Sequence, residues 1–583
     1  MKRLRMVLTL TLALLCLGNG AWLPSSRAAV DSPAPARAVA PVGLPLKGAP
    51  ARTVPAGLSP TGSQTLQTQV AKLTASDGAA GDMFGWYLAA DGDTMFVTAA
   101  LADVGGNPDQ GAAYVYHNEG WPDIWNQVLK LTAADGAVGD MFGSNVALSG
   151  DTAVVTAVGA DVGDNVDQGA AYVLHRNQGG PGAWGQVTKL TAADGAGGDW
   201  FGIDVRLIGD TLIVGAPWAD VGGNVDQGAA YVFYRNQGGP DAWGQVAKLT
   251  AADGAAGDWF GWNVSLIGDA VIVGAGNADI GGNADQGAAY VFYRNQGGPD
   301  AWGQAAKLTA ADGAAGDWFG FGASLSGDTA LAVACLADVG GNVDQGAAYI
   351  FYRNQGGPDA WGQVAKLTSD DGGAGDYFGW YPLVSSDTAV IGAYFADVGG
   401  NVQQGAAYVF YRNLGGPDAW GQASKLTAAD GAAGDMLADA GWISGAVVAL
   451  GAQGADVGGN VDQGAAYVFA LPSLHLFKMK AKGQPTVRPV WNKVVVQGIV
   501  RDGENNAFVG ATVVGAWTYP DGSIVPGVPV GPTDARGRFA FRLKEPLCGL
   551  FQFDVTGISA TAYTYDPMSN KVPPHIEIMV SCP

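Results

Sequence analysis

The sequence predicts an all-β protein whose main part is a seven-bladed β-propeller. The tripeptide Lys-Leu-Thr recurs seven times from Lys72 to Lys425, at a step of 58 and then 59 residues. Each repeat holds four short apolar runs separated by Gly, Asp, Asn and Pro, a pattern typical of strands joined by turns. Glycine accounts for 91 of the 583 residues and charged residues for 14%, whereas 48% is hydrophobic. This composition excludes a coiled coil and a disordered polymer.

The fourth repeat, residues 248–306, shows the expected blade. Its four predicted strands are residues 260–267, 270–275, 287–293 and 302–308. Gly268 and Asp269 supply a tight hairpin turn between the first two strands. The third strand is apolar throughout, so we expect both of its faces to be covered. Blades stacked around an axis provide that cover.

Chain order predicts how the ring closes. The seventh repeat ends after its third strand, at residues 467–469, and no fourth strand follows. Residues 69–73 resemble a fourth strand but precede the first repeat. We therefore expect this N-terminal strand to complete the last blade, which removes two exposed sheet edges.

A family resemblance rests on the Phe-Gly pairs of the repeats together with Gly215-Ala216-Pro217. The pairs are Phe84-Gly85, Phe142-Gly143, Phe201-Gly202, Phe260-Gly261, Phe319-Gly320 and Phe378-Gly379. This pattern resembles the FG-GAP repeat of the seven-bladed propeller in integrin α subunits, in the form known from bacterial extracellular proteins, over residues 64–470. The Gly-Ala-Pro motif is complete only in the third copy, and the seventh copy has Leu437-Ala438 in place of Phe-Gly. We therefore expect the last blade to be less regular.

The resemblance implies a calcium loop between the first two strands, but this chain has only a Gly-Asp turn there, as at Gly209-Asp210. Another acidic loop follows the second strand. Its candidate metal ligands are Asp103, Asn107, Asp109, Asp161, Asn165, Asp167, Asp220, Asn224, Asp226, Asp279, Asn283, Asp285, Asp338, Asn342, Asp344, Asp456, Asn460 and Asp462. The sixth copy has Asp397 and Asn401 but Gln403 at the last position.

Oxygen donors two residues apart can converge on Ca²⁺, and without a distal Glu the affinity should be no tighter than about 10⁻⁴ to 10⁻³ M. The alternative is that Asp, Asn and Gly cap the backbone amides of a tight loop. The sequence requires no cofactor, and weakly bound calcium is the one candidate.

Charge is concentrated on one predicted face. The net charge is −22, which disfavours nucleic acid and anionic lipid as partners. Because strands alternate in direction, the loops after the second and fourth strands should share one face. Four repeated Asp positions per repeat, less the Gln403 substitution, then place 27 Asp on that face. It should attract cations or a basic partner, or else serve only solubility.

The opposite face should carry a ring of tryptophans. They are Trp125, Trp184, Trp243, Trp302, Trp361 and Trp420. Such a ring could bind sugars by stacking, or each Trp could pack between blades.

The ends of the chain predict further parts. Residues 1–28 read as an export signal, 29–63 as an Ala/Pro-rich linker, 64–470 as the propeller and 471–492 as a second linker. Residues 493–583 resemble a carboxypeptidase-regulatory-like or transthyretin-like, Ig-like β-sandwich. In an exported protein Cys548 and Cys582 should form a disulfide, and Cys335 should be a buried thiol.

These features favour a non-catalytic, secreted or cell-surface binding or adhesion protein that uses the propeller faces. The sequence has no Gly-x-Ser-x-Gly, no His-Glu-x-x-His and no phosphate loop. The expected partner is an extracellular protein or glycan. We expect a monomer with no transmembrane segment. The alternatives are a propeller lectin and a secreted enzyme with an acidic propeller pocket.

Overall fold

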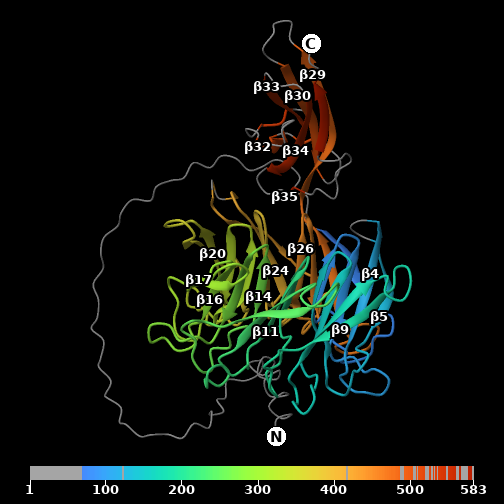
Figure 1. Cartoon of the computed structure of the whole chain (residues 1–583), viewed down its shortest axis with the longest axis vertical. Helices are drawn as coiled ribbons and strands as arrows, with labels where there is room; N and C mark the ends of the chain where they lie inside the picture. Colours follow the sequence, from blue (N-terminus) through green and yellow to red (C-terminus); the bar gives the residue numbers. More distant parts are fainter. Residues whose placement is uncertain are drawn as a thin grey trace, which may run out of the picture. The chain divides into compact units, whose positions relative to one another are not determined.

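The structure is a computed structural model of the chain (Figure 1). It describes residues 68–583 apart from 121–123, 415, 417, 486–491, 503–506, 509, 519–523, 527–529, 531, 535, 546–548, 560–563, 566–574 and 581–583. The predicted export signal, the Ala/Pro-rich linker, Cys548 and Cys582 lie outside the described residues. Every regular element described is a β-strand, and no helix in this part of the chain is long and apolar enough to cross a membrane.

Seven antiparallel four-stranded sheets form the blades of the predicted propeller. Blade 1 is β2 (Leu88–Asp91), β3 (Thr94–Ala99), β4 (Ala112–Gly120) and β5 (Ile124–Leu131). Blade 2 is β6 (Phe142–Ser149), β7 (Thr152–Ala157), β8 (Ala170–Arg176) and β9 (Trp184–Leu190). Blade 3 is β10 (Val205–Ile208), β11 (Thr211–Ala216), β12 (Ala229–Tyr234) and β13 (Gly244–Leu249). Blade 4 is β14 (Val264–Ile267), β15 (Ala270–Ala275), β16 (Ala288–Arg294) and β17 (Trp302–Leu308).

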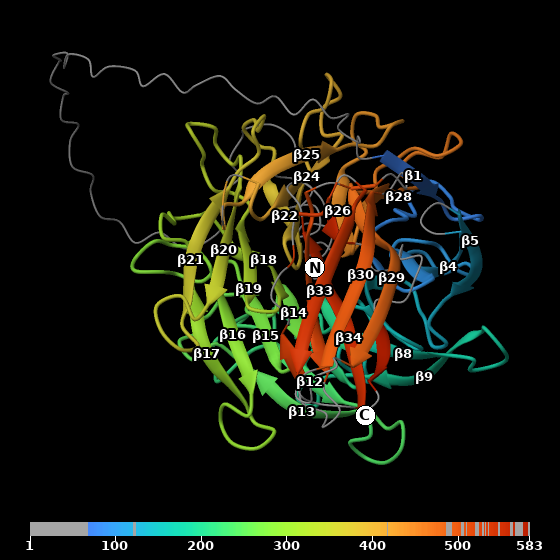
Figure 2. The same ribbon diagram turned by 90° about the horizontal axis from the view of Figure 1, so that it is seen from above.

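The remaining blades repeat this order. Blade 5 is β18 (Phe319–Ser326), β19 (Thr329–Ala334), β20 (Ala347–Arg353) and β21 (Trp361–Leu367). Blade 6 is β22 (Phe378–Ser385), β23 (Thr388–Ala393), β24 (Ala406–Tyr411) and β25 (Gly421–Leu426). Blade 7 is β26 (Leu437–Ser444), β27 (Val447–Ala452), β28 (Ala465–Ala470) and β1 (Thr68–Leu73). The first strands lie toward the axis and fourth strands such as β17 and β21 lie at the rim (Figure 2).

The N-terminal closure is confirmed. β1 pairs antiparallel with β28, with Lys72 opposite Tyr467 and Leu73 opposite Ala466. Leu73 is buried in the cluster that joins blades 7 and 1. The chain therefore closes its ring with residues from both ends of the repeat region.

In blade 4, the second and fourth strands match the predicted ranges and the third strand, β16, extends to Arg294. The first strand begins at Val264 rather than at Phe260. Gly261 lies before this start, with φ of 96°, and a Cβ on it would lie 2.2 Å from the backbone oxygen of Ala229 in the preceding blade. A residue with a Cβ would be strained in that conformation and at that approach, so the Phe-Gly motif forms a close backbone contact between blades.

The two halves of the repeat motif meet between blades. A Cβ on Gly215 of blade 3 would lie 1.9 Å from the oxygen of Gly261 in blade 4. Blade 7 has Ala438 at the Phe-Gly glycine position, with φ of 76°. The expected irregularity of this blade is nevertheless not observed, because β26 pairs with β27 in the same register as the equivalent strands of blades 2, 5 and 6. The ring accepts a strained alanine there.

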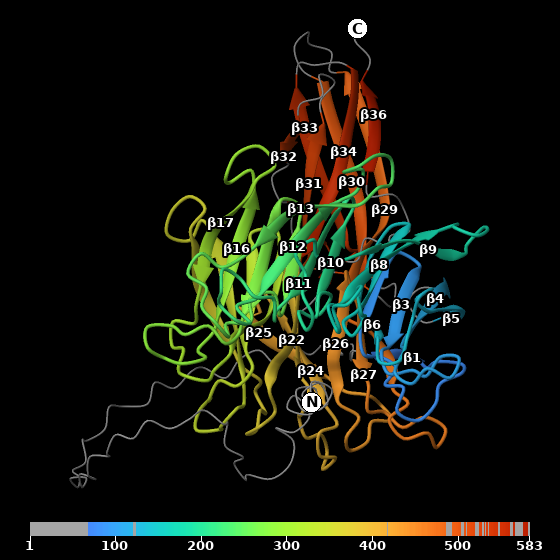
Figure 3. The ribbon, with the colours of Figure 1, turned by 60° about the horizontal axis from the view of Figure 1, so that its bottom comes forward.

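The C-terminal strands form two four-stranded sheets (Figure 3). The first contains β29 (Ser473–Pro485), β30 (Asn492–Asp502), β33 (Arg538–Glu545) and β35 (Thr564–Tyr565). The second contains β31 (Thr512–Thr518), β32 (Ile524–Pro526), β34 (Gly549–Ser559) and β36 (His575–Val580). The Phe541 and Phe553 rings, one from each sheet, lie 4.6 Å apart. β29 occupies much of the stretch expected to be a linker, because its sequence begins with alternating apolar residues that suit a strand.

Candidate functional site

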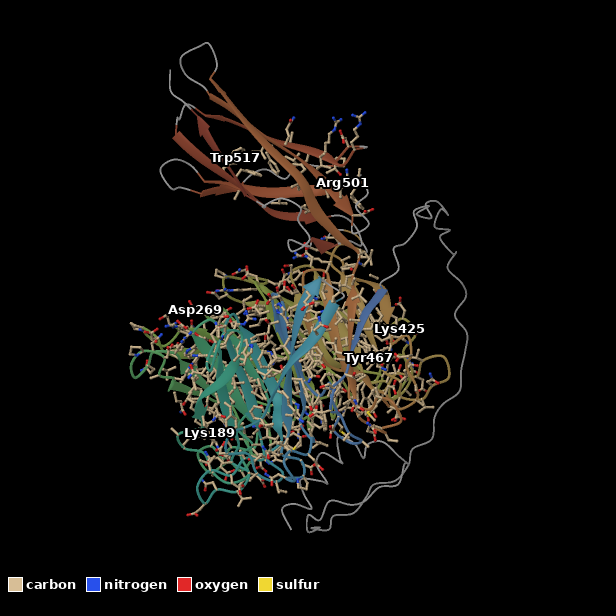
Figure 4. The ribbon with its side chains drawn as sticks, turned by 90° about the vertical axis from the view of Figure 1, so that its right-hand side faces the viewer. Lys189, Asp269, Lys425, Tyr467, Arg501 and Trp517 are labelled. Carbon is tan, nitrogen blue, oxygen red and sulfur yellow. The ribbon has the colours of Figure 1, made fainter. Side chains whose placement is uncertain are left out.

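The loops after the second and fourth strands share one end of the propeller, as predicted. The amide of Phe260 donates to Gln227 O over 2.9 Å, which joins the loop entering blade 4 to the loop after β11. The amide of Arg294 donates to Asp269 O over 2.9 Å at the other end. Figure 4 labels Lys189 and Asp269 toward these opposite ends. We call this end, where the Asp-rich loops lie, the acidic face.

Seven lysines lie among these carboxylates, which the sequence analysis missed. Lys307 Nζ lies 2.6 Å from Asp253 Oδ2 and 5.3 Å from the centre of the Tyr290 ring. Desolvation alone would raise the pKa of Asp253, but the hydrogen bond from Lys307 holds that pKa below its usual value. The other pairs are Lys72–Asp430, Lys130–Asp77, Lys189–Asp135, Lys248–Asp194, Lys366–Asp312 and Lys425–Asp371. The acidic face therefore carries less net charge than its Asp count suggests.

A second Asp of each loop is buried. Asp258 Oδ2 accepts a hydrogen bond from the amide of Ala255 over 2.8 Å. Desolvation raises the pKa of the Asp258 carboxyl. The equivalent residues are Asp82, Asp140, Asp199, Asp317, Asp376 and Asp435, all of them buried. These carboxylates hold the loop together rather than face a partner.

The predicted metal ligands form a self-capped loop in every repeat. Asp220 Oδ1 accepts a hydrogen bond from the amide of Asp226 over 3.0 Å, and Asn224 Nδ2 donates to Gln227 Oε1 over 2.8 Å. The same carboxylate-to-amide bond is made by Asp103, Asp161, Asp279, Asp338, Asp397 and Asp456. Gln403 keeps this bond because its backbone amide is the donor.

Among the described residues, no three His, Cys, Asp or Glu side chains cluster closely enough to hold a metal ion. The contacts match the turn-capping alternative. The calcium site stays a prediction.

The tryptophan ring packs between blades. Trp302 Nε1 donates to the Tyr234 hydroxyl of the preceding blade over 2.8 Å, and Trp361 makes the same bond to Tyr293 over 2.9 Å. The Trp184 ring lies 5.0 Å from the Phe96 ring of the preceding blade. Trp125, Trp184 and Trp243 are buried. These contacts agree with the packing alternative weighed above.

The propeller axis holds a polar network that the sequence analysis did not single out. Asp204 is almost fully buried and accepts hydrogen bonds from Asn145 and Asn263, each over 2.8 Å. Arg206 Nη1 lies 2.7 Å from Asp204 Oδ1, and Arg206 Nη2 donates to the Tyr381 hydroxyl over 3.1 Å. Blades 3 and 6 are not neighbours in the ring, so this bond must cross the axis. The Arg206 side chain is nevertheless 27% exposed, which shows that solvent reaches the axis.

A connected arc of aromatic side chains borders the axis at the acidic face. Its members are Trp200, Trp218, Trp259, Trp262, Trp318, Phe321, Tyr377, Trp380, Tyr394 and Phe395. Trp259 and Trp262 stack at 5.7 Å, and Trp318 and Phe321 stack at 5.9 Å. These four side chains are half-buried, so part of the aromatic surface faces solvent. Contiguous exposed aromatic surface is typical of binding sites.

Asp439 of blade 7 lies beside this arc. Trp380 Nε1 donates to Asp439 Oδ1 over 2.7 Å. Burial raises the pKa of Asp439 to about 7. The half-buried Tyr87 completes this side of the axis, because its ring lies 6.0 Å from the Tyr381 ring. We call Tyr87, Asp204, Arg206, Trp380, Tyr381 and Asp439, together with the aromatic arc, the axial site.

Sequence differences between the repeats indicate this site, and the sequence analysis did not use them. Residues 219–245 differ from the equivalent stretch 278–304 at 2 of 27 positions and from 337–363 at 1 of 27. Residues 203–218, which begin the blade, differ from 262–277 at 7 of 16 positions and from 321–336 at 11 of 16. The changes at the axis are chemically large, since Asp204 becomes Asn263 and Gly322. Comparing the copies with one another would have pointed to the axis.

Fold and site together define a seven-bladed propeller with a single, asymmetric axial site. Its repeats match the family model described as FG-GAP repeat over residues 67–116, 125–174, 184–233, 243–292, 302–351, 361–410 and 420–469. These segments cover more than half of the chain, and the protein belongs to the FG-GAP repeat family. The search of curated proteins found no match.

Solved structures show distant similarity. The periplasmic gluconolactonase PpgL of Pseudomonas aeruginosa is 15% identical with a TM-score of 0.38, over 59% of this chain and 86% of that one. The β-propeller domain of the Trilobed protease from Pyrococcus furiosus, described as having an open velcro topology, is 9% identical with a TM-score of 0.33, over 65% of this chain and 90% of that one.

Proposed function

We propose that this protein is an exported, non-catalytic binding or adhesion protein that holds its ligand at the axial site. The observation that carries the proposal is where the repeats differ. The acidic-face loops are near copies, and their side chains bond to their own backbone, as Asp220 does. At the axis the equivalent side chains differ between many of the blades, as Asp204, Asn263 and Gly322 do, so seven similar blades make one asymmetric surface. Export rests on the N-terminal sequence.

An extracellular protein is the first candidate partner, and a glycan is the second. The specific observation that favours a glycan is the half-buried stacked pair of Trp259 and Trp262, because indole rings can stack on sugar rings. This candidate differs from the one expected from the sequence, since the rim tryptophans such as Trp302 bond to the neighbouring blade. The predicted sandwich would then be a spacer or docking module.

The test is to probe the mature chain, residues 29–583, on a glycan array and on an array of extracellular proteins. Trp262→Ala removes half-buried axial surface and should abolish the binding seen. Val225→Ser is the matched control, because Val225 is 58% exposed on an acidic-face loop. Binding lost with Val225→Ser but kept with Trp262→Ala would place the site on the loops and overturn the proposal.

A further inference from the structure

Asp439 differs in kind from the residues that occupy its position in the other blades. Those residues are Trp86, Ser144, Ile203, Trp262, Phe321 and Trp380, of which four are aromatic and none is charged. Ala438 before it is a non-glycine residue with φ of 76°. Backbone strain of this kind clusters at functional sites. Blade 7 therefore presents a carboxylate where most blades present a ring.

The Asp439 carboxylate has little internal compensation. Within the described residues, its one hydrogen bond comes from Trp380 Nε1, over 2.7 Å, and no Lys or Arg nitrogen lies within 4.0 Å of it. Asp204, the carboxylate of the axis that is almost fully buried, has Arg206 at 2.7 Å and two asparagine donors. Removing an ionised carboxylate from water without a neighbouring cation costs free energy. A bound cation would therefore stabilise the ionised form of Asp439.

One aromatic side chain contacts this carboxylate, and others lie in its region. Trp380, which binds it, stacks on Tyr394 at 5.0 Å and 12°. Asp439 also acts electrostatically on the hydroxyls of Tyr87, Tyr381 and Tyr394. Asp439, Tyr87, Trp380 and Tyr381 are half-buried, whereas Tyr394 is buried behind Trp380. The half-buried groups of this region are therefore three aromatic side chains and one carboxylate.

We propose that Asp439, Tyr87, Trp380 and Tyr381 bind a quaternary ammonium group of the ligand. This inference rests on the proposed ligand-binding role of the axial site. Aromatic faces attract cations through the ring quadrupole, and desolvation strengthens the attraction. A quaternary ammonium donates no hydrogen bonds, so aromatic walls and a single carboxylate satisfy it. The net charge of −22 further favours a cationic ligand.

The test is calorimetry of the mature chain with tetramethylammonium chloride and choline chloride at pH 8. Asp439→Asn keeps an oxygen for the Trp380 bond but removes the charge, and it should weaken binding at least about tenfold. Asp397→Asn, on an acidic-face loop, should leave the affinity unchanged. Circular dichroism of both variants verifies the fold. Trp380→Phe is a further variant at the site, which removes the hydrogen bond to Asp439 but keeps an aromatic side chain.

The pH dependence gives an independent readout. With the Asp439 pKa near 7, the ionised fraction falls about 30-fold between pH 8 and pH 5.5, and affinity should fall with it. The groups that face this region are Asp204, Arg206 and the hydroxyls of Tyr87, Tyr381 and Tyr394. Asp439→Asn should remove the pH dependence of the affinity. If Asp204 were the titrating group instead, the pH dependence would remain in Asp439→Asn.

Several outcomes would overturn the proposal. These are no heat from either cation up to 10 mM, equal affinity in Asp439→Asn, or tighter binding of methylguanidinium or methylammonium than of tetramethylammonium. If methyl glycosides bind with the same affinity to the wild type and to Asp439→Asn, the site is assigned to glycans. If cations fail but Trp262→Ala still abolishes array binding, the axial site stands as the binding site and only the ligand class is wrong.

Discussion

Arg206 Nη2 donates a hydrogen bond to the Tyr381 hydroxyl over 3.1 Å, although the two residues are 175 positions apart and belong to blades 3 and 6. The guanidinium is held in place by Asp204, whose side chain is 1% exposed. Adjacent blades have extensive packing between them. Blades 3 and 6 are not neighbours in the ring, so the hydrogen bond from Arg206 to Tyr381 links these two blades across the axis.

We expect Arg206→Met to lower the free energy of unfolding by about 3 kcal/mol, because it leaves the Asp204 carboxylate buried without its cation. Tyr381→Phe removes one hydrogen bond and should cost about 1 kcal/mol. Urea unfolding followed by tryptophan fluorescence measures both. The double variant Asp204→Asn/Arg206→Met is the control and should be more stable than Arg206→Met alone. If the double variant is the less stable of the two, the ion pair is not the cause.

The closing strand leads to a second prediction. Deleting residues 64–74 removes β1, which exposes the edge of β28 and the pocket of Leu73. The lost ladder bonds and the burial of one leucine are worth about 3–5 kcal/mol, so the melting temperature should drop and aggregation should increase. Calorimetry with light scattering measures this, and deletion of residues 29–63 is the control. An unchanged melting curve for the deletion of residues 64–74 would mean that the ring does not need its N-terminal strand.

Ala438 leads to a third prediction. With φ of 76°, it occupies a conformation that disfavours a Cβ, and the other blades have glycine there. Ala438→Gly should raise the free energy of unfolding by about 0.5–1 kcal/mol. The reverse change, Gly261→Ala, should destabilise by more than about 2 kcal/mol, because the Cβ would lie 2.2 Å from Ala229 O. Equal unfolding midpoints for Ala438→Gly and the wild type would show that the ring has already relaxed around the alanine.

The propeller could be predicted because every repeat shows the same pattern of strands and turns. The turn at Gly268, the apolar third strand and the unpaired residues 69–73 each have a local physical meaning, and all were confirmed. The paired role of Lys307 was missed for a different reason. Lys307 lies on β17 and Asp253 lies before β14, 54 residues earlier, so their contact depends on how the whole blade folds back.

The axial site could not be predicted by interpreting each repeat separately. Arg206, Tyr381 and Asp439 occupy strands of three different blades, and a single repeat shows each of them as an isolated deviation. They meet because ring closure brings all first strands to one axis. The candidate metal ligands were located correctly in their loops, but the sequence could not show that the Asp220 carboxylate turns toward the amide of Asp226.

The acidic-face loops lead to a fourth prediction, which separates capping from calcium binding. Asp220→Ala removes the acceptor for the amide of Asp226 and should cost about 0.5–1.5 kcal/mol. Asp226→Gln copies blade 6, where Gln403 keeps the amide bond to Asp397 over 2.9 Å, and should be nearly neutral. Melting curves with and without 10 mM calcium measure both. If calcium binds, it should raise the melting temperature of the wild type and both variants should lose part of that rise; a capped loop gives no response to calcium in any of them.

The last prediction concerns stability against pH, and two sets of carboxylates act in opposite directions. Asp258 and its equivalents have raised pKa values in the folded state, first because burial disfavours the charged form. The folded state then binds protons more tightly than the unfolded state, so this contribution is fully present below the unfolded pKa of 3.8 and is lost as pH rises through the folded pKa. Asp253 and its equivalents have lowered pKa values because of their lysines, although desolvation opposes this. Their contribution is present above 3.8 and is lost as pH falls through the folded pKa.

The melting temperature should therefore rise on mild acidification from pH 7 and fall again below pH 3.8. Asp258→Asn should reduce the rise, because its amide does not titrate, and Lys307→Met should reduce the fall, because Asp253 loses the partner that lowers its pKa. Calorimetry between pH 7 and pH 3 measures both limbs on the same protein. A melting temperature that falls steadily from pH 7, with Asp258→Asn parallel to the wild type, would mean that the buried carboxylates are compensated in the folded state and that the lysine pairs alone set the acid response.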